Sequence, residues 1–168
     1  SNRETGGARE IVPFELTWLN DIFGTARPLA CVKAKLTKLP ADIDDIYHCL
    51  LGYDNNVLAN LTVEVISRPK ATREMRILGC DGEILFSTDT NCVRYINTSM
   101  DDWMEFKFDS GTVESQYINP EEPYIEEMKD FIAAVEAKDP RLFPNSLEDD
   151  YKVLQILSEL ERIANINL

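Results

Sequence analysis

The sequence predicts an α+β domain with one large, mostly antiparallel sheet and helices packed on one of its faces. The strand-like runs come first along the chain and the amphipathic helical patterns come last. This order is typical of α+β proteins rather than of alternating βαβ folds. The clearest local signal is the stretch from Arg76 to Leu85, where two apolar runs flank Gly79-Cys-Asp-Gly82. Such a sequence favours a tight hairpin turn.

The N-terminal part predicts a linker followed by a short helix. Residues 1–8 are polar and contain two glycines, so we expect a linker, and Ser1-Asn2 is interpreted as the remnant of a cleaved tag. The domain itself is expected to fill residues 9–168. Pro13 to Phe23 is helical in its apolar spacing, with Pro13 suited to the first turn and Gly24 to the C-terminal cap.

The central part predicts six or seven antiparallel strands in one sheet. Each expected strand is a short apolar or alternating run bounded by turn residues. The runs are Leu29 to Leu36, Asp44 to Tyr53, Val57 to Val65, Thr72 to Leu78, Glu83 to Ser87, Cys92 to Asn97 and Met104 to Phe108.

The C-terminal part predicts two amphipathic helices, Pro123 to Ala137 and Leu147 to Ile163, with Ser146 and Asp149 in a capping arrangement at the second. Each carries an apolar stripe at helical spacing, which indicates packing against the sheet. The stripes are Tyr124, Met128, Phe131 and Val135 in the first helix, and Leu147, Tyr151, Leu154 and Leu157 in the second, supported there by Val153, Ile156, Leu160 and Ile163.

Several strands carry apolar residues on both alternating sets, for instance around Ala30 and Ile84. A sheet with one solvated face would alternate more cleanly. We therefore expect part of the second face to be covered by another subunit or by a further domain. The alternative is that these residues lie at edges and corners of the sheet.

The composition excludes some classes of partner. The net charge is −13, from 30 acidic against 17 basic side chains, with no cluster of Lys and Arg, so nucleic acid is not an expected partner. No run approaches the roughly 20 apolar residues that a membrane span needs, so we expect a soluble protein. The four cysteines have no C-x-x-C spacing and are expected to be reduced and buried, which favours a cytoplasmic location.

The order of these motifs resembles the C-terminal domain of the glucose-fructose oxidoreductase, inositol dehydrogenase and rhizopine-catabolism (Gfo/Idh/MocA) family over roughly Gly6 to Ala164. The motifs are Gly6-Gly7, a short helix ending in Phe23-Gly24, the hairpin at Gly79 to Gly82, Tyr124-x-x-x-Met-x-x-Phe131, and Pro140 before a final helix. The resemblance implies an oxidoreductase with NAD or NADP bound by an N-terminal Rossmann domain. It also implies that the present domain binds substrate and mediates oligomerisation through its open sheet face.

Two family elements are absent from this sequence. No Gly-x-Gly-x-x-Gly motif follows a strand, and no Glu-Lys-Pro triplet occurs. We therefore expect no cofactor-binding residue in this chain, with the dinucleotide held by the missing domain, and we expect the chain alone to be inactive.

The resemblance also indicates candidate site residues near the start of the chain. Many family members have Asp-x-x-x-His on the first helix of this domain, and aligning the flanking glycines puts Glu10 at the Asp position and Phe14 at the His position. Phe14 cannot transfer a proton. Glu10 and Glu15 are thus the catalytic candidates, and Glu10, Phe14 and Glu15 the substrate-binding candidates. The alternative is a solvated carboxylate at Glu10, stabilised by the helix dipole.

Other polar residues give weaker signals. His48 is the only histidine and is interpreted as a structural strand residue, so no metal site is expected. Arg94-Tyr95 and Trp103 could line a carbohydrate pocket, although strand aromatics are more often core residues.

Three functions follow as hypotheses. The first is the substrate and oligomerisation domain of an NAD(P)-dependent oxidoreductase acting on a sugar or sugar nucleotide. The second is a catalytically inactive relative that serves as a scaffold or regulator, which the replacement by Phe14 favours. The third is an unrelated α+β ligand-binding or dimerisation module.

Overall fold

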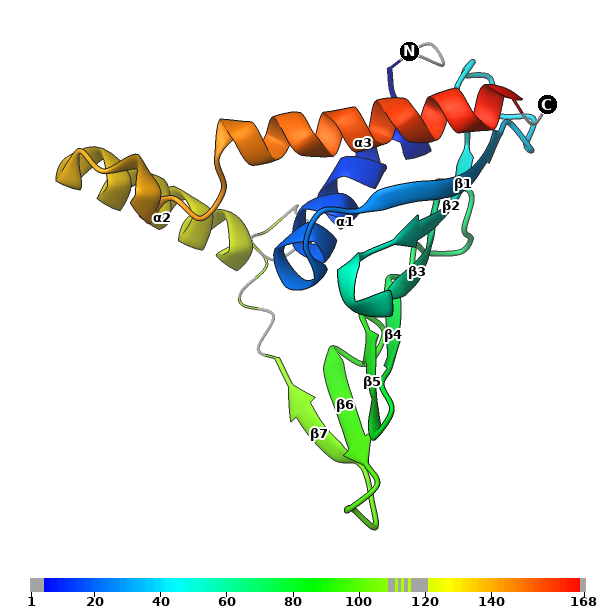
Figure 1. The fold of residues 1–168 in the computed structure, drawn as a ribbon. Coiled ribbons are helices and arrows are strands. Elements are labelled where there is room, and N and C mark those ends of the chain that lie inside the picture. The colour runs from blue at the N-terminus through cyan, green and yellow to red at the C-terminus, as the bar shows by residue number, and fades with distance from the viewer. Residues whose placement is uncertain (1–4, 109–110, 112, 114, 116–120, 167–168) are drawn as a thin grey trace. The chain divides into compact units, whose positions relative to one another are not determined.

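The computed structural model describes residues 5–108, 111, 113, 115 and 121–166, and Figure 1 shows the elements that they form. The chain divides into two compact units, one made of Ser1–Arg68 with Asn145–Leu168 and the other of Pro69–Pro144. We call them the first unit and the second unit. The predicted boundary between residues 8 and 9 stays a prediction.

The predicted α+β class is confirmed. Seven antiparallel strands and three α-helices are present among the described residues. The strands form a three-stranded sheet of order β1-β2-β3 and a four-stranded sheet of order β4-β5-β6-β7, rather than the single sheet that the sequence predicted. β3 ends where the Glu64 carboxylate accepts the backbone N–H groups of Ile66 and Ser67, at 2.5 and 2.7 Å. Donors bound to a side chain are not free to extend a strand ladder.

The first unit contains two long helices and the three-stranded sheet. Its elements are α1 (Ala8–Phe23), β1 (Arg27–Ala34), β2 (Ile46–Gly52), the 3-10 turn η1 (Asp54–Asn56), β3 (Leu58–Glu64) and α3 (Leu147–Ile166). All three strands lie within two residues of the predicted bounds.

The core of the first unit lies between one face of the sheet and the helices α1 and α3, whereas the sequence predicted that Pro123 to Ala137 and Leu147 to Ile163 would cover the sheet. Alternate residues of the central strand β2 are buried against the helices, and Cys31 of β1 and Val63 of β3 are buried beside them, whereas His48 and Leu50 of β2 face outward. The buried core residues are Ala8, Val12, Leu16 and Leu19 of α1, Val153, Ile156, Leu157, Leu160 and Ala164 of α3, Cys31, Tyr47, Cys49, Leu51 and Val63 of the strands, and Ala26 and Tyr53 beside them. Full burial of each large aliphatic side chain contributes about 1.5–3 kcal/mol.

α1 begins at Ala8, so Pro13 lies inside the helix and the predicted start at Pro13 is wrong. Gly7 adopts φ 70°, and a Cβ there would lie 2.7 Å from the Asp44 carbonyl oxygen. The Ala8 N–H donates to that same oxygen at 3.2 Å. These contacts set the helix start, and they outweigh the preference of proline for a first turn because Ala8 and Val12 both bury their side chains.

α3 begins with the predicted cap, because the Asp149 N–H donates to the Ser146 hydroxyl at 3.1 Å. The predicted apolar stripe is correct only in part. Leu147, Tyr151 and Leu154 are exposed, and of the predicted stripe only Leu157 is buried. The supporting residues form the actual core face, since Val153, Ile156, Leu157 and Leu160 recur at the same helical spacing on another side of the helix.

The second unit contains the four-stranded sheet and one helix. Its elements are β4 (Glu74–Leu78), β5 (Gly82–Ser87), β6 (Cys92–Asn97), β7 (Met104–Lys107), α2 (Glu122–Ala137) and the 3-10 turn η2 (Pro140–Leu142). The predicted hairpin is confirmed, because the Gly79 N–H donates to the Gly82 carbonyl at 2.9 Å and Leu78 pairs with Glu83. Cys80 lies at the tip of this turn and is exposed, contrary to prediction, while the other three cysteines are buried.

The two faces of the four-stranded sheet differ in chemistry. One cross-strand row consists of Arg76, Leu85, Arg94 and Glu105, and another of Met75, Phe86, Val93 and Phe106. The first face carries ion pairs from Arg76 to Glu83 at 2.6 Å and from Arg94 to Glu105 at 3.3 Å. The second face is apolar, and Phe106 remains about half exposed.

α2 does not form the predicted core layer. The stripe of Tyr124, Met128, Phe131 and Val135 is exposed, and Ala134 is the one buried residue of this helix. Phe131 makes an edge-to-face contact with Phe143, at 6.1 Å between ring centroids. The periodicity correctly predicts an amphipathic helix, but no described element covers its apolar side.

Candidate functional site

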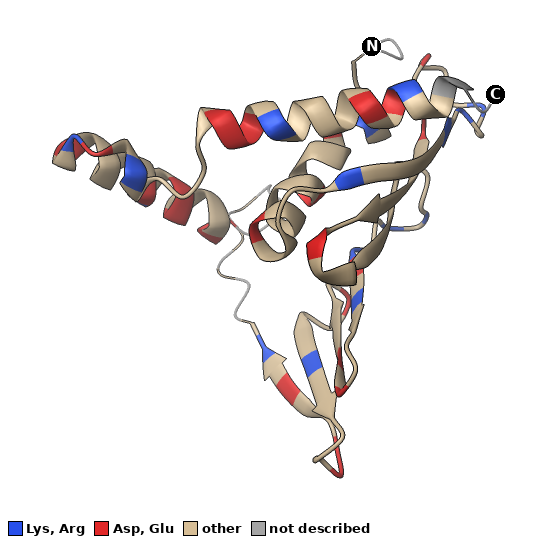
Figure 2. Cartoon of the chain, viewed as in Figure 1, with Lys and Arg blue, Asp and Glu red and all other residues tan. Residues whose placement is uncertain are grey.

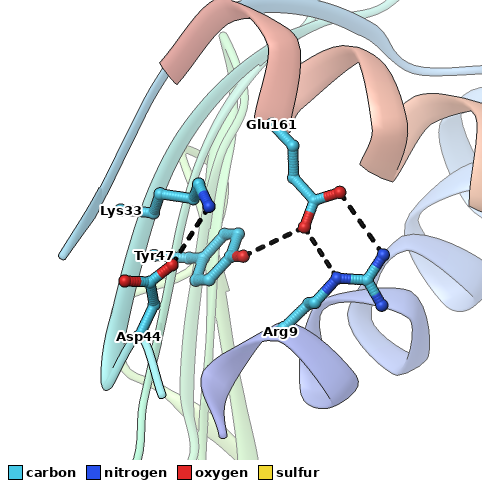
Figure 3. Close-up of polar contacts among 5 residues, drawn as sticks. All are labelled: Arg9, Lys33, Asp44, Tyr47 and Glu161. Atoms are coloured by element: carbon cyan, nitrogen blue, oxygen red, sulfur yellow. Dashed lines mark hydrogen bonds and ion pairs between the residues drawn. The ribbon is translucent and has the colours of Figure 1, made fainter. Parts of the chain in front are cut away.

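The N-terminal half of α1 is the candidate site because it carries the residues that the sequence predicted. Its orientation is determined by Arg9, which points inward (Figure 3). Arg9 Nε donates to Glu161 Oε1 of α3 at 2.7 Å, and Arg9 Nη2 donates to Glu161 Oε2 at 3.3 Å. The Tyr47 hydroxyl of β2 donates to the same Oε1 at 3.2 Å. One carboxylate therefore ties the first turn of α1 to α3 and to the sheet.

Arg9 and Tyr47 have shifted pKa values in this network. The hydrogen bond to Glu161 raises the pKa of Arg9, although partial burial opposes the shift. Burial raises the pKa of Tyr47, and the negative charge of Glu161 adds to that effect. Both shifts favour a charged Arg9 and a neutral Tyr47 at neutral pH. The network is a structural clamp under α1 rather than a reactive group, since all three side chains already satisfy one another.

A second polar cluster supports the loop that receives the helix. Lys33 Nζ forms an ion pair with Asp44 Oδ2 at 3.0 Å (Figure 3). The neighbouring Asp45 is fully buried, and its carboxylate accepts from the backbone N–H groups of Leu36 and Thr37 at 2.7 and 2.8 Å and from the Thr37 hydroxyl at 2.6 Å. Burial opposes the charged form, but these hydrogen bonds prevail and lower the pKa of Asp45.

Glu10 and Phe14 lie together on the outer face of α1. The buried positions 8, 12, 16 and 19 face the core, so residues four apart on the opposite side face outward. Glu10 is exposed, and Phe14 is 72% exposed, which is unusual for so large an apolar side chain. Ile11, Asp21 and Ile22 extend this exposed surface along the helix. Glu10 also lies in the first turn, where the helix dipole favours a carboxylate.

Glu15 lies apart from this pair. It is half-buried, and Trp18 Nε1 donates to Glu15 Oε2 at 2.6 Å. An acid among apolar residues needs a hydrogen-bond partner, and the indole N–H of Trp18 is such a partner. The structure therefore brings Glu10 and Phe14 onto one surface and places Glu15 in a local bond with Trp18.

The surface of Glu10 and Phe14 has the chemistry of a carbohydrate contact. A carboxylate accepts hydrogen bonds from hydroxyl groups, and an aromatic ring packs against the apolar face of a sugar ring. Phe14 has no proton to transfer, so any acid–base role on this surface would fall to Glu10.

The remaining candidates of the sequence analysis do not form a site together. Arg94 lies over the Trp103 ring, with Cζ 4.8 Å from the ring centroid. Tyr95 is on the opposite face of β6, where its hydroxyl accepts a hydrogen bond from the Asn97 side-chain amide. His48 Nδ1 contacts Thr62 Oγ1 at 2.9 Å on the outward face of the first sheet. Among the described residues, no group of His, Cys, Asp and Glu is placed so that it could hold a metal ion.

The Arg9, Glu161 and Tyr47 network was not predicted from the sequence. Its members are far apart in the chain, and a single sequence gives no sign of their contact. One signal was available, because Glu161 follows Leu157 by four residues and so lies beside the buried stripe of α3. An acid at that place indicates a buried partner.

Several solved structures share the fold. Levoglucosan dehydrogenase, in complex with NADH and levoglucosan, matches with a TM-score of 0.79 and 16% identity, over 96% of this chain and 49% of that one. An oxidoreductase domain protein from Kribbella flavida matches with a TM-score of 0.73 and 15% identity, over 97% of this chain and 49% of that one. UDP-N-acetylglucosamine 3-dehydrogenase from Acidithiobacillus ferrooxidans matches with a TM-score of 0.64 and 18% identity, over 92% of this chain and 45% of that one.

The chain thus spans about half the length of these structures. No protein-family model and no curated protein gives a significant match to the sequence. The predicted resemblance is confirmed at the level of the fold, which is that of a domain in oxidoreductases of this type. In the part of the chain that is described, no helix is both long and apolar enough to cross a membrane.

Proposed function

We propose that this chain is the substrate-binding and oligomerisation domain of an NAD(P)-dependent oxidoreductase that acts on a sugar or a sugar nucleotide. The observation that carries the proposal is the fold, which covers nearly the whole chain and about half of a dehydrogenase bound to NADH and levoglucosan. The exposed pair of Glu10 and Phe14 supplies matching chemistry for a sugar ligand.

The residues of this chain do not fit a dinucleotide. Both sheets are antiparallel among the described residues, and the sequence has no Gly-x-Gly-x-x-Gly turn between a strand and a helix. The N-terminus of α1 is also unsuited, because its first N–H is bonded to Asp44. NAD or NADP would therefore be bound by an N-terminal Rossmann domain outside this chain, and the chain alone would be inactive.

In the assembled enzyme, the outer face of α1 would line the substrate pocket. Glu10 would accept hydrogen bonds from sugar hydroxyls, and Phe14 would pack against the ring. Arg9, from the same turn, would hold this surface in place through Glu161. Glu15 would act on the site indirectly, by its bond to Trp18.

Two exposed apolar surfaces would bind the proposed partners. The outward face of β1-β2-β3 carries exposed Val32, Leu50 and Leu58 and would pair with a second copy of the chain. The apolar stripe of α2 would dock on the proposed N-terminal domain, because this helix buries only Ala134 against the described residues and so gains little stability from packing. The sequence of α2 also contains five acidic residues and Lys129, and Figure 2 shows segments of both charges along this helix.

A second candidate is an inactive relative that works as a scaffold or regulator. The observation that favours it is Phe14, since the resemblance places a proton-transferring histidine there. This alternative predicts the same fold and partners but no turnover.

The proposal is tested on the full-length protein that contains this chain. We expect micromolar binding of NADH or NADPH in calorimetry, and substrate-dependent change in nicotinamide absorbance with at least one member of a panel of sugars and sugar nucleotides. The chain alone is the control and is expected to bind neither nucleotide. A full-length protein that binds the nucleotide but oxidises or reduces no member of the panel would favour the scaffold. Absence of nucleotide binding would contradict the proposal.

The oligomer surface is tested by Leu50→Glu, with Leu36→Glu as the matched control. Both leucines are exposed, but Leu50 lies on the central strand of the outward face and Leu36 in the loop after β1. Sedimentation should show dissociation for Leu50→Glu alone. Equal masses for both variants and the wild type would rule out this face as the interface.

A further inference from the structure

Cys31 and Cys49 face each other across β1 and β2. They are directly opposite in the register of the two strands, and their Sγ atoms are 3.9 Å apart. Both are free thiols, and each side chain is 1% exposed. Cys92 and Cys80 belong to the second unit. The first unit thus contains one pair of thiols in contact.

The backbone already has a spacing that suits a disulfide. Residues directly opposite in an antiparallel pair have Cα atoms about 4.5–5.5 Å apart. A disulfide spans Cα separations of about 4.4–6.8 Å. The sulfur atoms must therefore approach by rotation of the side chains, while the strands can keep their places.

The two thiols differ in reactivity. A hydrogen bond from Cys49 lowers the pKa of Cys31 against the effect of burial, and the positive charge of Lys33 contributes in the same direction. The hydrogen bond to Cys31 and burial both raise the pKa of Cys49. Cys31 is accordingly the thiol that ionises first, and the thiolate is the nucleophile in thiol oxidation.

We propose that Cys31 and Cys49 form an oxidisable dithiol, which closes to a cross-strand disulfide in the native fold on reaction with a peroxide. In the first step the Cys31 thiolate attacks one oxygen of hydrogen peroxide and the O–O bond breaks. This step yields a sulfenic acid at Cys31 and hydroxide, which takes up a proton to become water. In the second step Cys49 sulfur attacks Cys31 sulfur, the S–O bond breaks and a second water leaves. Peroxide is reduced to two water molecules, and the dithiol loses two electrons and two protons.

The bond would join the two strands on which the helices pack. β1 contacts α3, and β2 provides Tyr47 to the Arg9 and Glu161 network. A disulfide closing the loop from residue 31 to residue 49 restricts the unfolded chain, and we expect it to raise the Tm.

The experiment uses the Cys80→Ser protein, since removing the exposed thiol prevents links between molecules. The native protein is treated with hydrogen peroxide, blocked with an alkylating agent, digested without reductant and analysed by mass spectrometry. We expect a linked peptide pair containing Cys31 and Cys49, which separates on reduction. Cys49→Ser in the same background should give no such link and should leave oxidised or alkylated Cys31. Recovery of both cysteines as alkylated thiols in the Cys80→Ser protein would overturn the proposal.

A second experiment forms the disulfide during refolding, so that it does not depend on peroxide reaching the buried thiols. The Cys80→Ser protein is unfolded and refolded with oxidised and reduced glutathione, and the disulfide-bonded product is isolated. We expect near-UV circular dichroism equal to that of the reduced protein and a Tm higher by several degrees. A bonded product with lost near-UV signal or a lower Tm would show that the native fold does not accept the bond.

Discussion

The two units of this chain use similar sequence patterns but bury them to different extents. In the first unit, two helices and one sheet face share a core in which Val12, Leu16, Leu51 and Leu160 are fully buried. In the second unit, Cys92 and Ala134 are the buried residues among those described. Apolar periodicity is present in both, so the difference lies in whether the chain supplies the matching surface.

The proposed assembly would make use of this difference. The first unit can hold α1 in position by itself, because core contacts and the Arg9 network both act on that helix. The second unit leaves one sheet face and α2 uncovered, and exposed apolar surfaces of this kind usually mark interaction sites. The unit that orients the proposed site is thus the better packed one.

The largest expected effect is the removal of a core leucine. Leu160→Ala in α3 should destabilise the first unit by about 2–5 kcal/mol, because Leu160 is fully buried and a cavity remains. Leu154→Ala is the control on the same helix and should change stability by less than about 0.5 kcal/mol, since Leu154 is exposed. Urea unfolding followed by circular dichroism measures both. Equal losses would mean that the assigned core face of α3 is wrong.

Asp45 tests the polar support of α1. Asp45→Ala should lower the free energy of unfolding by about 3 kcal/mol, because three hydrogen-bond donors lose a charged acceptor that is fully buried. The pKa of Asp45 is lowered in the folded protein, so its contribution is present above the unfolded value of about 3.9 and is lost as the pH falls through the folded value. As the pH decreases below 4, the urea concentration at the unfolding midpoint should therefore decrease more steeply for the wild type than for Asp45→Ala. Asp21 is exposed, so Asp21→Ala is the control. A loss of stability in Asp21→Ala equal to that in Asp45→Ala would contradict the stabilising role assigned to Asp45.

The sequence predicted the elements better than it predicted their partners. Strand bounds and the Gly79 to Gly82 turn depend on local patterns, and they agree with the structure. The stripe on α2 was read correctly as amphipathic, but periodicity does not say what covers a stripe. The start of α1 was missed because Gly7 packs against a loop more than 30 residues away. Of the candidate site, the pairing of Glu10 with Phe14 follows from helical spacing, whereas the contact of Glu161 with Arg9 spans the whole chain.

The smallest stability effects come from two tyrosines of the same core. The Tyr47 hydroxyl donates to Glu161, whereas the Tyr53 hydroxyl is buried and finds no partner among the described residues. Tyr47→Phe should lower stability by about 1 kcal/mol, and Tyr53→Phe should leave it equal or slightly higher. Urea unfolding of the two variants measures both changes. A stability loss in Tyr53→Phe together with none in Tyr47→Phe would contradict the assigned difference between the two hydroxyls.

The same pair predicts an alkaline effect. Burial raises the pKa of Tyr53 to about 12, above the unfolded value of about 10. Its contribution to stability is therefore complete below pH 10 and is lost as the pH rises toward 12. Tyr53→Phe should weaken this loss, which thermal unfolding between pH 9 and 12 can measure. An unchanged pH dependence in the variant would show that Tyr53 is not the group responsible.

The most direct test of the account is the kcat/KM of Glu10→Gln in the full-length protein, measured beside Glu15→Gln together with the Tm of both. Glu10 is exposed next to Phe14, so its substitution should lower kcat/KM roughly ten- to a hundredfold, as expected for a charged hydrogen bond of about 1.5–3 kcal/mol, and should leave the Tm unchanged. Glu15 is bonded to Trp18, so Glu15→Gln should lower the Tm and change kcat/KM less. Unchanged kcat/KM in Glu10→Gln would contradict the proposal that this face of α1 binds the substrate.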